Sequence, residues 1–468
     1  MKVGWNDTIT AIATAVGEAG IAVLRISGPE AISLAAKGFK GKIGLATAAT
    51  QTAHFGKFHD AVGNVLDEVV MVIFREPTSY TGENVVEISC HGGTQVPGTI
   101  LHTLLEYGAR LAEPGEFTKR AFLNGRIDLS QAEAVADLIH AGSERSHQSS
   151  LKQLQGELGR QVKNLREELI RAVGLLELEL DFTEEGFELT DKSKVAGQIR
   201  EAIGSIRGLL ETYHTGRIYR DGVKVVLAGM PNVGKSSLLN ALLKEERAIV
   251  TDLPGTTRDT IEESLLINGL RFRIVDTAGL REAVDRAEQE GVKRSEDQIN
   301  SSDLLVMVMD SSKPLGDEEL NLARRLAEDL RDRATAIIAF NKMDLVPETN
   351  GALEQKVYEI QPAAVVKVSA LTGKGLERLR EALVRSALAG QHTITEASVT
   401  VTSARHYGIL LESEKSLALA LNSLEAGASG EFVTPDIRAA LDKLGEITGA
   451  VTTDEILNEI FSKFCIGK

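Results

Sequence analysis

The sequence predicts a multidomain protein with an N-terminal α+β domain, an α-helical bundle domain, and an α/β domain inserted into the bundle. Its length of 468 residues corresponds to about three domains. Apolar residues recur at alternating spacings of three and four between Leu151 and Leu180, a pattern typical of a long amphipathic helix. Between residues 217 and 385, short apolar runs alternate with helical stretches, which indicates a doubly wound sheet.

The composition narrows the class of protein. A formal net charge of -15 argues against broad, nonspecific binding of nucleic acid and leaves room for a local basic patch. The two cysteines, Cys90 and Cys465, cannot form a disulfide framework, so we expect a reducing compartment. Asp7 and Glu18 interrupt the N-terminal apolar stretch, which therefore lacks the core of a signal peptide. No apolar run approaches the length that spans a bilayer, and these features predict a cytoplasmic protein.

Residues 1–122 predict the α+β domain. Strands are expected at 21–26, 69–74 and 85–89, and a helix closed by Gly108 is expected at 97–107. Glu83 and His91 lie at predicted strand ends, where polar residues are candidates for a pocket. Sequence physics alone favours a turn carboxylate and a surface histidine at these two positions.

Two segments, residues 123–216 and 386–468, predict the helical bundle domain, with the domain of residues 217–385 inserted between them. The leucine stripe from 151 to 180 predicts bundle core, because such stripes are more often core than a partner site. Further helices are expected at 195–213, 404–424, 435–448 and 453–464.

Residues 229–236 read Gly-Met-Pro-Asn-Val-Gly-Lys-Ser, between a strand-like run and a helix-like run. This context is what a phosphate-binding loop requires. Gly229 and Gly234 let backbone N–H groups turn toward an anion, and the following helix points its positive end there. Lys235 can reach the β- and γ-phosphates of a nucleotide, and the Ser236 hydroxyl can bind Mg²⁺.

Further motifs at predicted strand ends complete a guanine-nucleotide site. Asp276 can hold the metal through water, the Gly279 amide can meet the γ-phosphate, and Thr257 can complete the Mg²⁺ shell. The Asp344 carboxylate can accept from guanine N1–H and the 2-amino group, an arrangement that adenine does not offer, and the Ala370 amide can donate to guanine O6. The order of these motifs predicts a Ras-like P-loop GTPase domain.

The strands of this domain are expected at 223–228, 263–267, 271–275, 304–309, 336–340 and 365–368, with Asn268-Gly269 as a hairpin turn. The expected GTP-binding residues are Asn232, Val233, Gly234, Lys235, Ser236, Ser237, Thr251, Asp252, Leu253, Pro254, Gly255, Thr256, Thr257, Asp276, Thr277, Ala278, Gly279, Asn341, Lys342, Met343, Asp344, Ser369, Ala370 and Leu371.

The groups that would promote hydrolysis are less obvious. Leu280 stands where small signalling GTPases place a glutamine that orients water, and leucine cannot do this. Another group must help, and the acidic candidates in the next loop are Glu282, Asp285, Glu288 and Glu290. No arginine finger is identifiable, although Arg281 is available. The Asn232 amide oxygen can hold a monovalent cation near the phosphates, with a simple turn residue as the alternative.

Together these motifs resemble the MnmE (TrmE) family of tRNA-modification GTPases, and the resemblance covers the full length. In the GTPase half and the tail, the motifs are Pro-Asn-Val, Thr-Thr-Arg-Asp, Asp-Thr-Ala-Gly-Leu-Arg, Asn-Lys-Met-Asp and the final Cys-Ile-Gly-Lys. In the N-terminal half they are Leu-Arg-Ile-Ser-Gly at 24–28, Thr-Gly-Glu at 81–83, His-Gly-Gly at 91–93, Pro-Gly-Glu-Phe at 114–117 and Ala-Phe-Leu-Asn at 121–124.

The resemblance implies a homodimer joined through N-terminal domains that bind a tetrahydrofolate one-carbon donor, 5,10-methylenetetrahydrofolate, with 5-formyltetrahydrofolate as an analogue. It implies a GTPase activated by potassium and by dimerisation of its GTP-binding domains. It also implies a complex with the FAD-dependent protein MnmG. That complex would modify C5 of the wobble uridine in certain tRNAs to the carboxymethylaminomethyl or aminomethyl form.

Residue roles carry over at matching positions. The resemblance implies potassium ligands at Asn232, Thr251, Leu253 and Thr256, and Mg²⁺ ligands at Ser236 and Thr257. It implies that Glu288 orients water through another water, that Lys235 acts on the phosphates, and that Cys465 has a role in the modification. It implies folate contacts at Arg25, Glu83, Arg126 and Lys468, where relatives often have lysine at position 126.

A ribosome-assembly GTPase, a binding switch without small-molecule chemistry, is the alternative hypothesis. That class shares the Gly-x-Pro-Asn-Val-Gly-Lys-Ser loop. The two hypotheses differ at the N-terminal domain and the tail, so folate binding would favour the first and co-sedimentation with ribosomal subunits the second.

Overall fold

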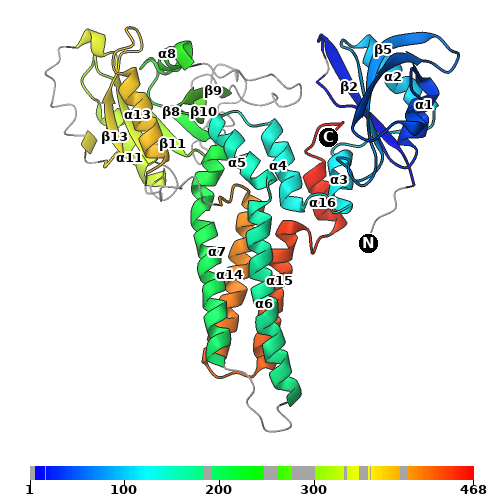
Figure 1. Cartoon of the computed structure of the whole chain (residues 1–468). Helices are drawn as coiled ribbons and strands as arrows, with labels where there is room; N and C mark the ends of the chain where they lie inside the picture. Colours follow the sequence, from blue (N-terminus) through cyan, green and yellow to red (C-terminus); the bar gives the residue numbers. More distant parts are fainter. Residues whose placement is uncertain are drawn as a thin grey trace, which may run out of the picture. The chain divides into compact units, whose positions relative to one another are not determined.

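A computed structural model describes residues 6–15, 17–182, 192–246, 262–276, 301–330, 335–346, 357–358, 360–389 and 399–468. The chain divides into two compact units (Figure 1). Unit 1 comprises Met1–Ile139, Gln153–Ile203 and Glu412–Lys468, and unit 2 comprises His140–Lys152 and Gly204–Leu411. Each unit has its own sheet and its own hydrophobic core. The domain ranges expected from the sequence stay predictions.

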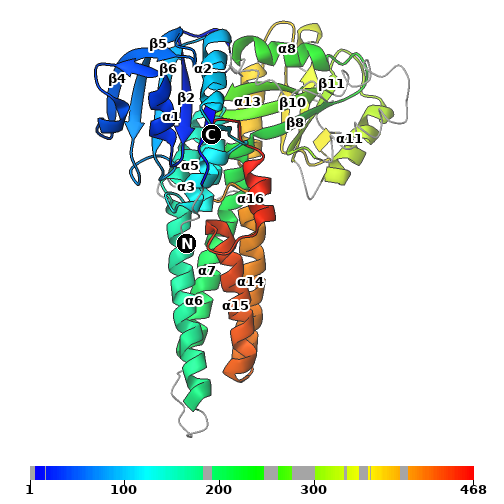
Figure 2. The same cartoon turned by 90° about the vertical axis from the view of Figure 1, so that its right-hand side faces the viewer.

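Unit 1 contains a seven-stranded sheet with the order β3-β4-β5-β6-β2-β1-β7. Its strands are β1 (Ile9–Ile12), β2 (Ile21–Ser27), β3 (Phe39–Gly41), β4 (Thr52–His59), β5 (Val65–Phe74), β6 (Val85–His91) and β7 (Arg110–Leu111). Neighbouring strands are antiparallel, except that β1 and β7 are parallel. The sheet is accompanied by α1 (Ala31–Gly38), η1 (Leu45–Thr47) and α2 (Gln95–Glu106) (Figure 2).

The alternation of side chains along β2 shows which face of this sheet is buried. Ala22, Leu24 and Ile26 lie in a core that includes residues of α1 and α2. Val23 and Arg25 lie on the opposite face and are half-buried. The three predicted strands are confirmed within β2, β5 and β6, and the predicted helix is confirmed as α2.

The sequence does not predict β1, β3, β4 and β7. Strand β4 is the clearest case, because its sequence contains a glycine and few β-branched residues. Gly56 is required there, since a Cβ atom at this position would lie 2.5 Å from the Lys40 carbonyl oxygen and 2.5 Å from a ring carbon of Phe39. The close packing of β3 against β4 therefore requires a glycine in β4, and this glycine weakens the sequence signal for a strand.

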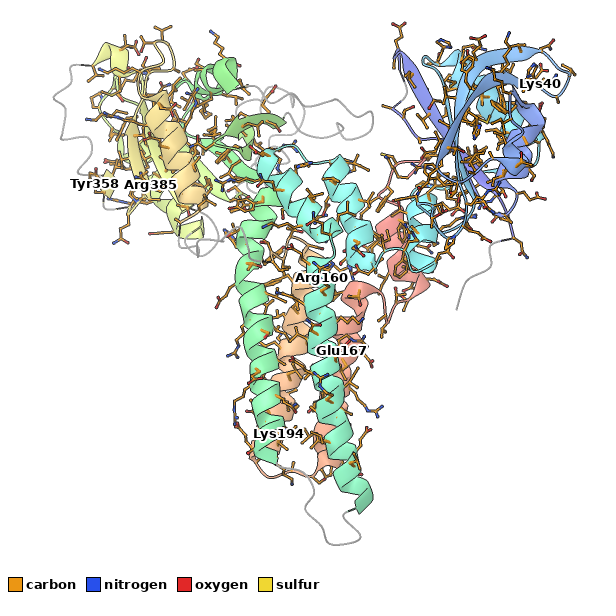
Figure 3. All side chains as sticks on the ribbon, in the orientation of Figure 1. Lys40, Arg160, Glu167, Lys194, Tyr358 and Arg385 are labelled. Carbon is orange, nitrogen blue, oxygen red and sulfur yellow. The ribbon has the colours of Figure 1, made fainter. Side chains whose placement is uncertain are left out.

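The helices of unit 1 are α3 (Glu116–Leu123), α4 (Leu129–Ile139), α6 (Glu157–Phe182), α15 (Gly430–Thr448) and α16 (Asp454–Phe461), with the first part of α7 (Lys192–Asp221) and the second part of α14 (Ala404–Glu425). Helix α6 packs along α15, and both views show them side by side (Figures 1 and 2). The buried side chains of α6 include Leu158, Val162, Leu165, Leu169, Val173 and Leu176, which confirms the stripe as bundle core over 158–176. At its start the prediction is wrong, because Leu151 is 38% exposed. Charged residues such as Arg160 and Glu167 lie on its exposed side (Figure 3).

The single long helix expected over 151–180 is wrong, because two helices form there. Helix α5 (Glu144–Leu154) ends before Gly156, and α6 begins at Glu157. Gly156 has a φ of 79°, a left-handed conformation that suits glycine and ends a right-handed helix. The Gln131 side chain donates to the Leu154 carbonyl at 2.8 Å and so satisfies one acceptor at the end of α5.

The predicted C-terminal helices are confirmed with shifted bounds. Helix α15 begins at Gly430, so Pro435 lies inside it rather than at its start. Thr453 caps α16, and its side chain accepts a hydrogen bond from the Ile456 amide. Within the ranges that the structure describes, no helix combines the length and the apolar character needed to cross a membrane.

Unit 2 contains a six-stranded sheet with the order β13-β12-β11-β8-β10-β9. Its strands are β8 (Val223–Ala228), β9 (Glu262–Ile267), β10 (Leu270–Asp276), β11 (Leu304–Asp310), β12 (Thr335–Asn341) and β13 (Ala364–Lys367). All pairs are parallel except β9 with β10, whose turn residues Asn268 and Gly269 have φ values of 50° and 75°. The doubly wound sheet and its hairpin are confirmed.

Helices cover both faces of this sheet. On one face, α8 (Lys235–Glu246) and α13 (Leu376–Ala387) share a core with the strands. On the other, α11 (Asp317–Leu330) contributes Leu320 and Ala323 to a second core. A short η3 helix (Met343–Leu345) follows β12. The loops at the carboxyl ends of the parallel strands are thereby left at one edge, which is where such sheets bind ligands.

Candidate functional sites

The loop between β8 and α8 has a backbone that depends on its glycines. Gly229 and Gly234 have φ values of 146° and 93°. A Cβ atom on Gly229 would lie 2.3 Å from the Val308 carbonyl oxygen, and one on Gly234 would lie 2.4 Å from the Asn341 amide nitrogen. The loop opens at the N-terminal end of α8, where the backbone N–H groups and the helix dipole attract an anion.

Lys235 is held over this loop. Its side chain is buried, and its Nζ atom donates to the carbonyl oxygens of Gly229 and Met230 at 3.0 Å each. Ser236 and Ser237 follow on the first turn of α8 and are exposed. The predicted phosphate-binding lysine and serine therefore lie side by side at the mouth of the loop.

The ends of β12 and β13 meet the same loop. The Asn341 side chain donates from Nδ2 to the Val233 carbonyl at 2.9 Å and accepts from the Ala370 amide at 3.0 Å. Ser369 donates its hydroxyl to Asp344. The Ala370 amide, expected to donate to a guanine oxygen, donates to Asn341 in this structure. Three motifs that are far apart in sequence thus meet, with Leu371 strongly exposed at their rim.

Lys342 joins the base-recognition motif to the phosphate loop. Its Nζ atom donates to the Asn232 carbonyl at 2.8 Å and to Asp310 at 2.7 Å. Burial alone would raise the pKa of Asp310, but hydrogen bonds from Lys342 and Ser312 outweigh it and lower that pKa. Within the described residues, no hydrogen bond engages the Asn232 side chain, so its amide oxygen is available to a cation.

Two loops that carry further predicted residues lie outside the described residues. Asp276 ends β10, in register with Leu227 of β8, and so lies at the edge that carries the phosphate loop. The predicted residues outside the described ranges are Thr251, Asp252, Leu253, Pro254, Gly255, Thr256, Thr257, Thr277, Ala278, Gly279, Arg281, Glu282, Asp285, Glu288 and Glu290.

A second candidate site lies in unit 1, around Arg25. This side chain donates from Nε and Nη2 to Glu87, its cross-strand neighbour, at 3.0 and 2.8 Å. Its guanidinium lies 5.2 Å from the ring centre of Tyr80 and 5.6 Å from that of Phe117. Cation–π contacts and a carboxylate therefore fix Arg25 on the open face of the sheet.

Five charged side chains gather beside it, and we call them the α3 charge cluster. They are Asp7, Glu83, Arg110, Glu116 and Arg120. Arg120 is fully buried, and the cluster combines three carboxylates with two guanidiniums. Burial alone would raise the pKa values of Asp7 and Glu116, but hydrogen bonds from Arg110, together with Arg120, lower both.

The tail of the chain lies against the N-terminal end of α3. The Phe117 amide donates to the Lys468 backbone oxygen at 3.2 Å, and the Gly115 amide donates to the Cys465 carbonyl at 3.4 Å. Gly467 has a φ of 96°, and a Cβ atom there would lie 2.3 Å from the Ile12 carbonyl oxygen. The Cys-Ile-Gly-Lys tail is therefore docked closely, with Cys465 exposed.

The structure brings the four predicted folate residues to the surroundings of α3. Arg25 contacts Phe117, Glu83 contacts Arg120, and Lys468 bonds to the Phe117 amide. The stem of Arg126 lies beside Gly82, next to Glu83 in sequence. His91 lies elsewhere, where its ring nitrogen Nδ1 is 2.7 Å from an Asp67 carboxylate oxygen.

Sequence reasoning missed three residues of this site, namely Tyr80, Phe117 and Arg120. The Pro-Gly-Glu-Phe motif carries a signal for Phe117, since aromatic side chains near an arginine provide a stacking surface. For Arg120 the local signal is limited to Glu116, four residues earlier on the same helix, because its other carboxylate partners, Asp7 and Glu83, come from distant parts of the chain.

Comparisons with known proteins cover both units. A family model for the GTP-binding protein TrmE N-terminus matches residues 8–126, and one for the MnmE helical domain matches residues 129–465. The chain is 44% identical over 466 residues to the tRNA modification GTPase MnmE of Salinibacter ruber, covering 99% of each chain. It is 44% identical over 470 residues to that of Moorella thermoacetica, covering 99% of this chain and 100% of the relative. A solved G domain of the T. maritima FeoB iron transporter is 33% identical, covers 35% of this chain and 98% of that one, and has a TM-score of 0.26.

Proposed function

The chain belongs to the MnmE family of tRNA modification GTPases and is a GTP hydrolase, and from this premise we propose how its sites divide the work. Unit 2 hydrolyses GTP with Mg²⁺ and potassium. Unit 1 binds a tetrahydrofolate one-carbon donor such as 5,10-methylenetetrahydrofolate. With the FAD-dependent protein MnmG, the hydrolysis cycle drives modification of C5 of the wobble uridine in certain tRNAs to the carboxymethylaminomethyl form. The single observation that carries the proposal is the family match over nearly the whole chain.

Guanine-nucleotide binding uses the groups that converge on the phosphate loop. Lys235 approaches the phosphates, and Ser236, with Thr257, binds Mg²⁺. Asp344 accepts from the base, and its carboxylate is already oriented by Ser369. A nucleotide competition assay tests this assignment: GTP should displace a fluorescent guanine nucleotide, and ATP at the same concentration should not.

Potassium activation is supported by the position of Asn232. Its backbone is fixed by Lys342, whereas its amide oxygen has no hydrogen bond among the described residues. Thr251, Leu253 and Thr256 would complete the potassium site, and Glu288 would orient water. GTP turnover should be faster in potassium than in sodium, because a cation near the phosphates replaces an arginine finger. Equal rates in the two salts, or potassium stimulation that persists in Asn232→Ala, would contradict this part.

Folate binding is supported by the α3 charge cluster. The pterin edge offers several N–H donors, and the Glu83 carboxylate, held by Ser27 and Arg120, keeps acceptor capacity for them. Arg25, Arg126 and Lys468 would provide the remaining contacts. Isothermal titration of the full chain with 5-formyltetrahydrofolate tests this. Saturable binding would support the folate site, and a lack of binding would contradict it.

A homodimer through unit 1 is supported by the open face of its sheet. Ile21 is 65% exposed and Phe55 is 64% exposed, with Val70 directly opposite Phe55. The ion pairs on this face, Arg25–Glu87 and Lys57–Glu68, are internally balanced, so a second copy can approach without charge repulsion.

Light scattering after gel filtration tests the dimer. Phe55→Asp should give a monomer, because a carboxylate would have to be buried in the interface. Phe432→Asp is the matched control, since Phe432 is 68% exposed on α15 and lies outside this face. A Phe55→Asp variant that stays dimeric would exclude this face.

The decisive test of the whole proposal is mass spectrometry of wobble uridine in tRNA from cells that lack this cytoplasmic protein. The modified nucleoside should disappear and return when the gene is restored. If the amount of the modified nucleoside stays unchanged and ribosome assembly is defective, the binding-switch alternative would be favoured. Cys465 serves in the modification step, and its replacement by serine should reduce the modified nucleoside without reducing GTP turnover.

A further inference from the structure

We infer that Arg120 is the positioning residue of the unit 1 site, which holds the Glu83 carboxylate ready for the donor edge of a ligand. The inference rests on the folate binding proposed above and adds a residue to it. Arg120 lies on α3, and its side chain has no exposed surface, so it contacts the ligand only through Glu83.

The guanidinium of Arg120 is anchored on one side. Its Nη2 atom donates to Asp7 Oδ1 at 2.8 Å and to Glu116 Oε1 at 2.9 Å, both within the range of charge-assisted hydrogen bonds. Its Nη1 atom donates to the Asp7 backbone oxygen at 3.1 Å. Asp7 and Glu116 therefore fix the plane of the guanidinium before any contact with Glu83 is counted.

Glu83 meets the other side of this group through weaker contacts. Arg120 Nη1 lies 3.3 Å from Oε1 and 3.4 Å from Oε2, so it faces both carboxylate oxygens. The Ser27 hydroxyl donates to Oε2 at 2.7 Å. These contacts fix the orientation of the carboxylate from two directions. Of the three carboxylates of the α3 charge cluster, Glu83 has the longest contacts to Arg120.

This arrangement selects a class of ligand. An ionised carboxylate accepts about four hydrogen bonds, so Glu83 keeps acceptor capacity beyond Ser27 and Arg120. A carboxylate with free acceptor capacity favours an edge with adjacent N–H donors, as in a 2-aminopyrimidinone ring. A ligand with a hydrogen-bond acceptor at that edge would be rejected, because neither this acceptor nor the Glu83 carboxylate would find a donor.

Arg110 provides an internal control for this role. It donates to Asp7 Oδ2 at 2.7 and 2.8 Å and to Glu116 at 2.6 and 3.1 Å, the same two carboxylates that anchor Arg120. Among the described residues, no hydrogen bond or ion pair joins Arg110 to Glu83. A change at Arg110 therefore disturbs the anchor without removing a direct contact to Glu83.

The experiment is isothermal titration of full-length variants with 5-formyltetrahydrofolate, beside their melting temperatures. Arg120→Gln should weaken binding at least 30-fold. Arg120→Lys should weaken it about 5- to 10-fold, because one ammonium cannot hold the anchor and face both oxygens of Glu83. Arg110→Gln should also lower the melting temperature, but it should weaken binding clearly less than Arg120→Gln does, because Arg110 acts on Glu83 only through the shared anchor.

A double-mutant cycle with Glu83→Gln separates positioning from general loss of structure. If Arg120 acts through Glu83, Arg120→Gln should weaken binding of 5-formyltetrahydrofolate much less in the Glu83→Gln variant than in the wild type. Full additivity, or affinity losses in Arg110→Gln as large as in Arg120→Gln, would overturn the inference. Absence of binding to the wild type would instead remove the folate proposal on which the inference rests.

Discussion

Gly234 offers a sharp test of how the phosphate loop and the guanine motif are coupled. A Cβ atom at this position would lie 2.4 Å from the Asn341 amide nitrogen, so Gly234→Ala must displace that amide. Asn341 would then lose its hydrogen bonds to Val233 and Ala370, at about 1 kcal/mol each. The combined loss of about 2 kcal/mol corresponds to roughly 30-fold weaker guanine-nucleotide binding.

Backbone strain must be separated from this clash. Gly427 also has a positive φ, 84°, but no atom lies within 4 Å of where its Cβ would be. Gly427→Ala therefore incurs the strain alone, roughly 1–2 kcal/mol of stability, and should bind nucleotide like the wild type. Titration of a fluorescent GDP analogue measures both variants. Wild-type affinity in Gly234→Ala, or an equal loss in Gly427→Ala, would refute the reasoning.

Three further predictions concern unit 1. Leu169→Ala on α6 should lower the free energy of unfolding by about 2–5 kcal/mol, measured by denaturant titration, because Leu169 is fully buried in the bundle. Because Asp7 and Glu116 have pKa values below their ordinary 3.8 and 4.5, their stabilisation is complete above those values and declines as the pH falls below them. Melting temperatures between pH 7 and pH 3 should show this decline, reduced in Glu116→Gln. Burial raises the pKa of Cys90 to about 11, so iodoacetamide at pH 8 should modify the exposed Cys465 first, as peptide mass spectrometry would show.

The nucleotide site was predictable because its chemistry is local. Each motif is a short run at a strand end, and the topology of a doubly wound sheet brings these ends together. The structure accordingly joins Asn341, Lys342 and Ala370 to the phosphate loop. The loops with Thr257 and Glu288 lie outside the described residues, so their roles stay predictions.

The unit 1 site was predictable only in part, for a physical reason. Glu83 is recognisable at a strand end, but its orientation depends on Arg120, which Asp7 and Glu116 hold in place. No local pattern encodes such a group of side chains. The break between α5 and α6 was missed for a local reason. The apolar periodicity continues on both sides of Gly156, but the left-handed conformation of this glycine ends the helix.

The pairing of α6 with α15 places a condition on the order in which the molecule forms. The two helices come from residues 157–182 and 430–448, on either side of most of unit 2. During synthesis the apolar side chains of α6 stay exposed to solvent until α15 has emerged from the ribosome. If the intervening segment folds first, it shortens the flexible chain that must be closed and lowers the entropy lost when the helices meet. A mutation that slows the folding of unit 2 should therefore lower the yield of soluble protein, even when it leaves every residue of the helical bundle unchanged.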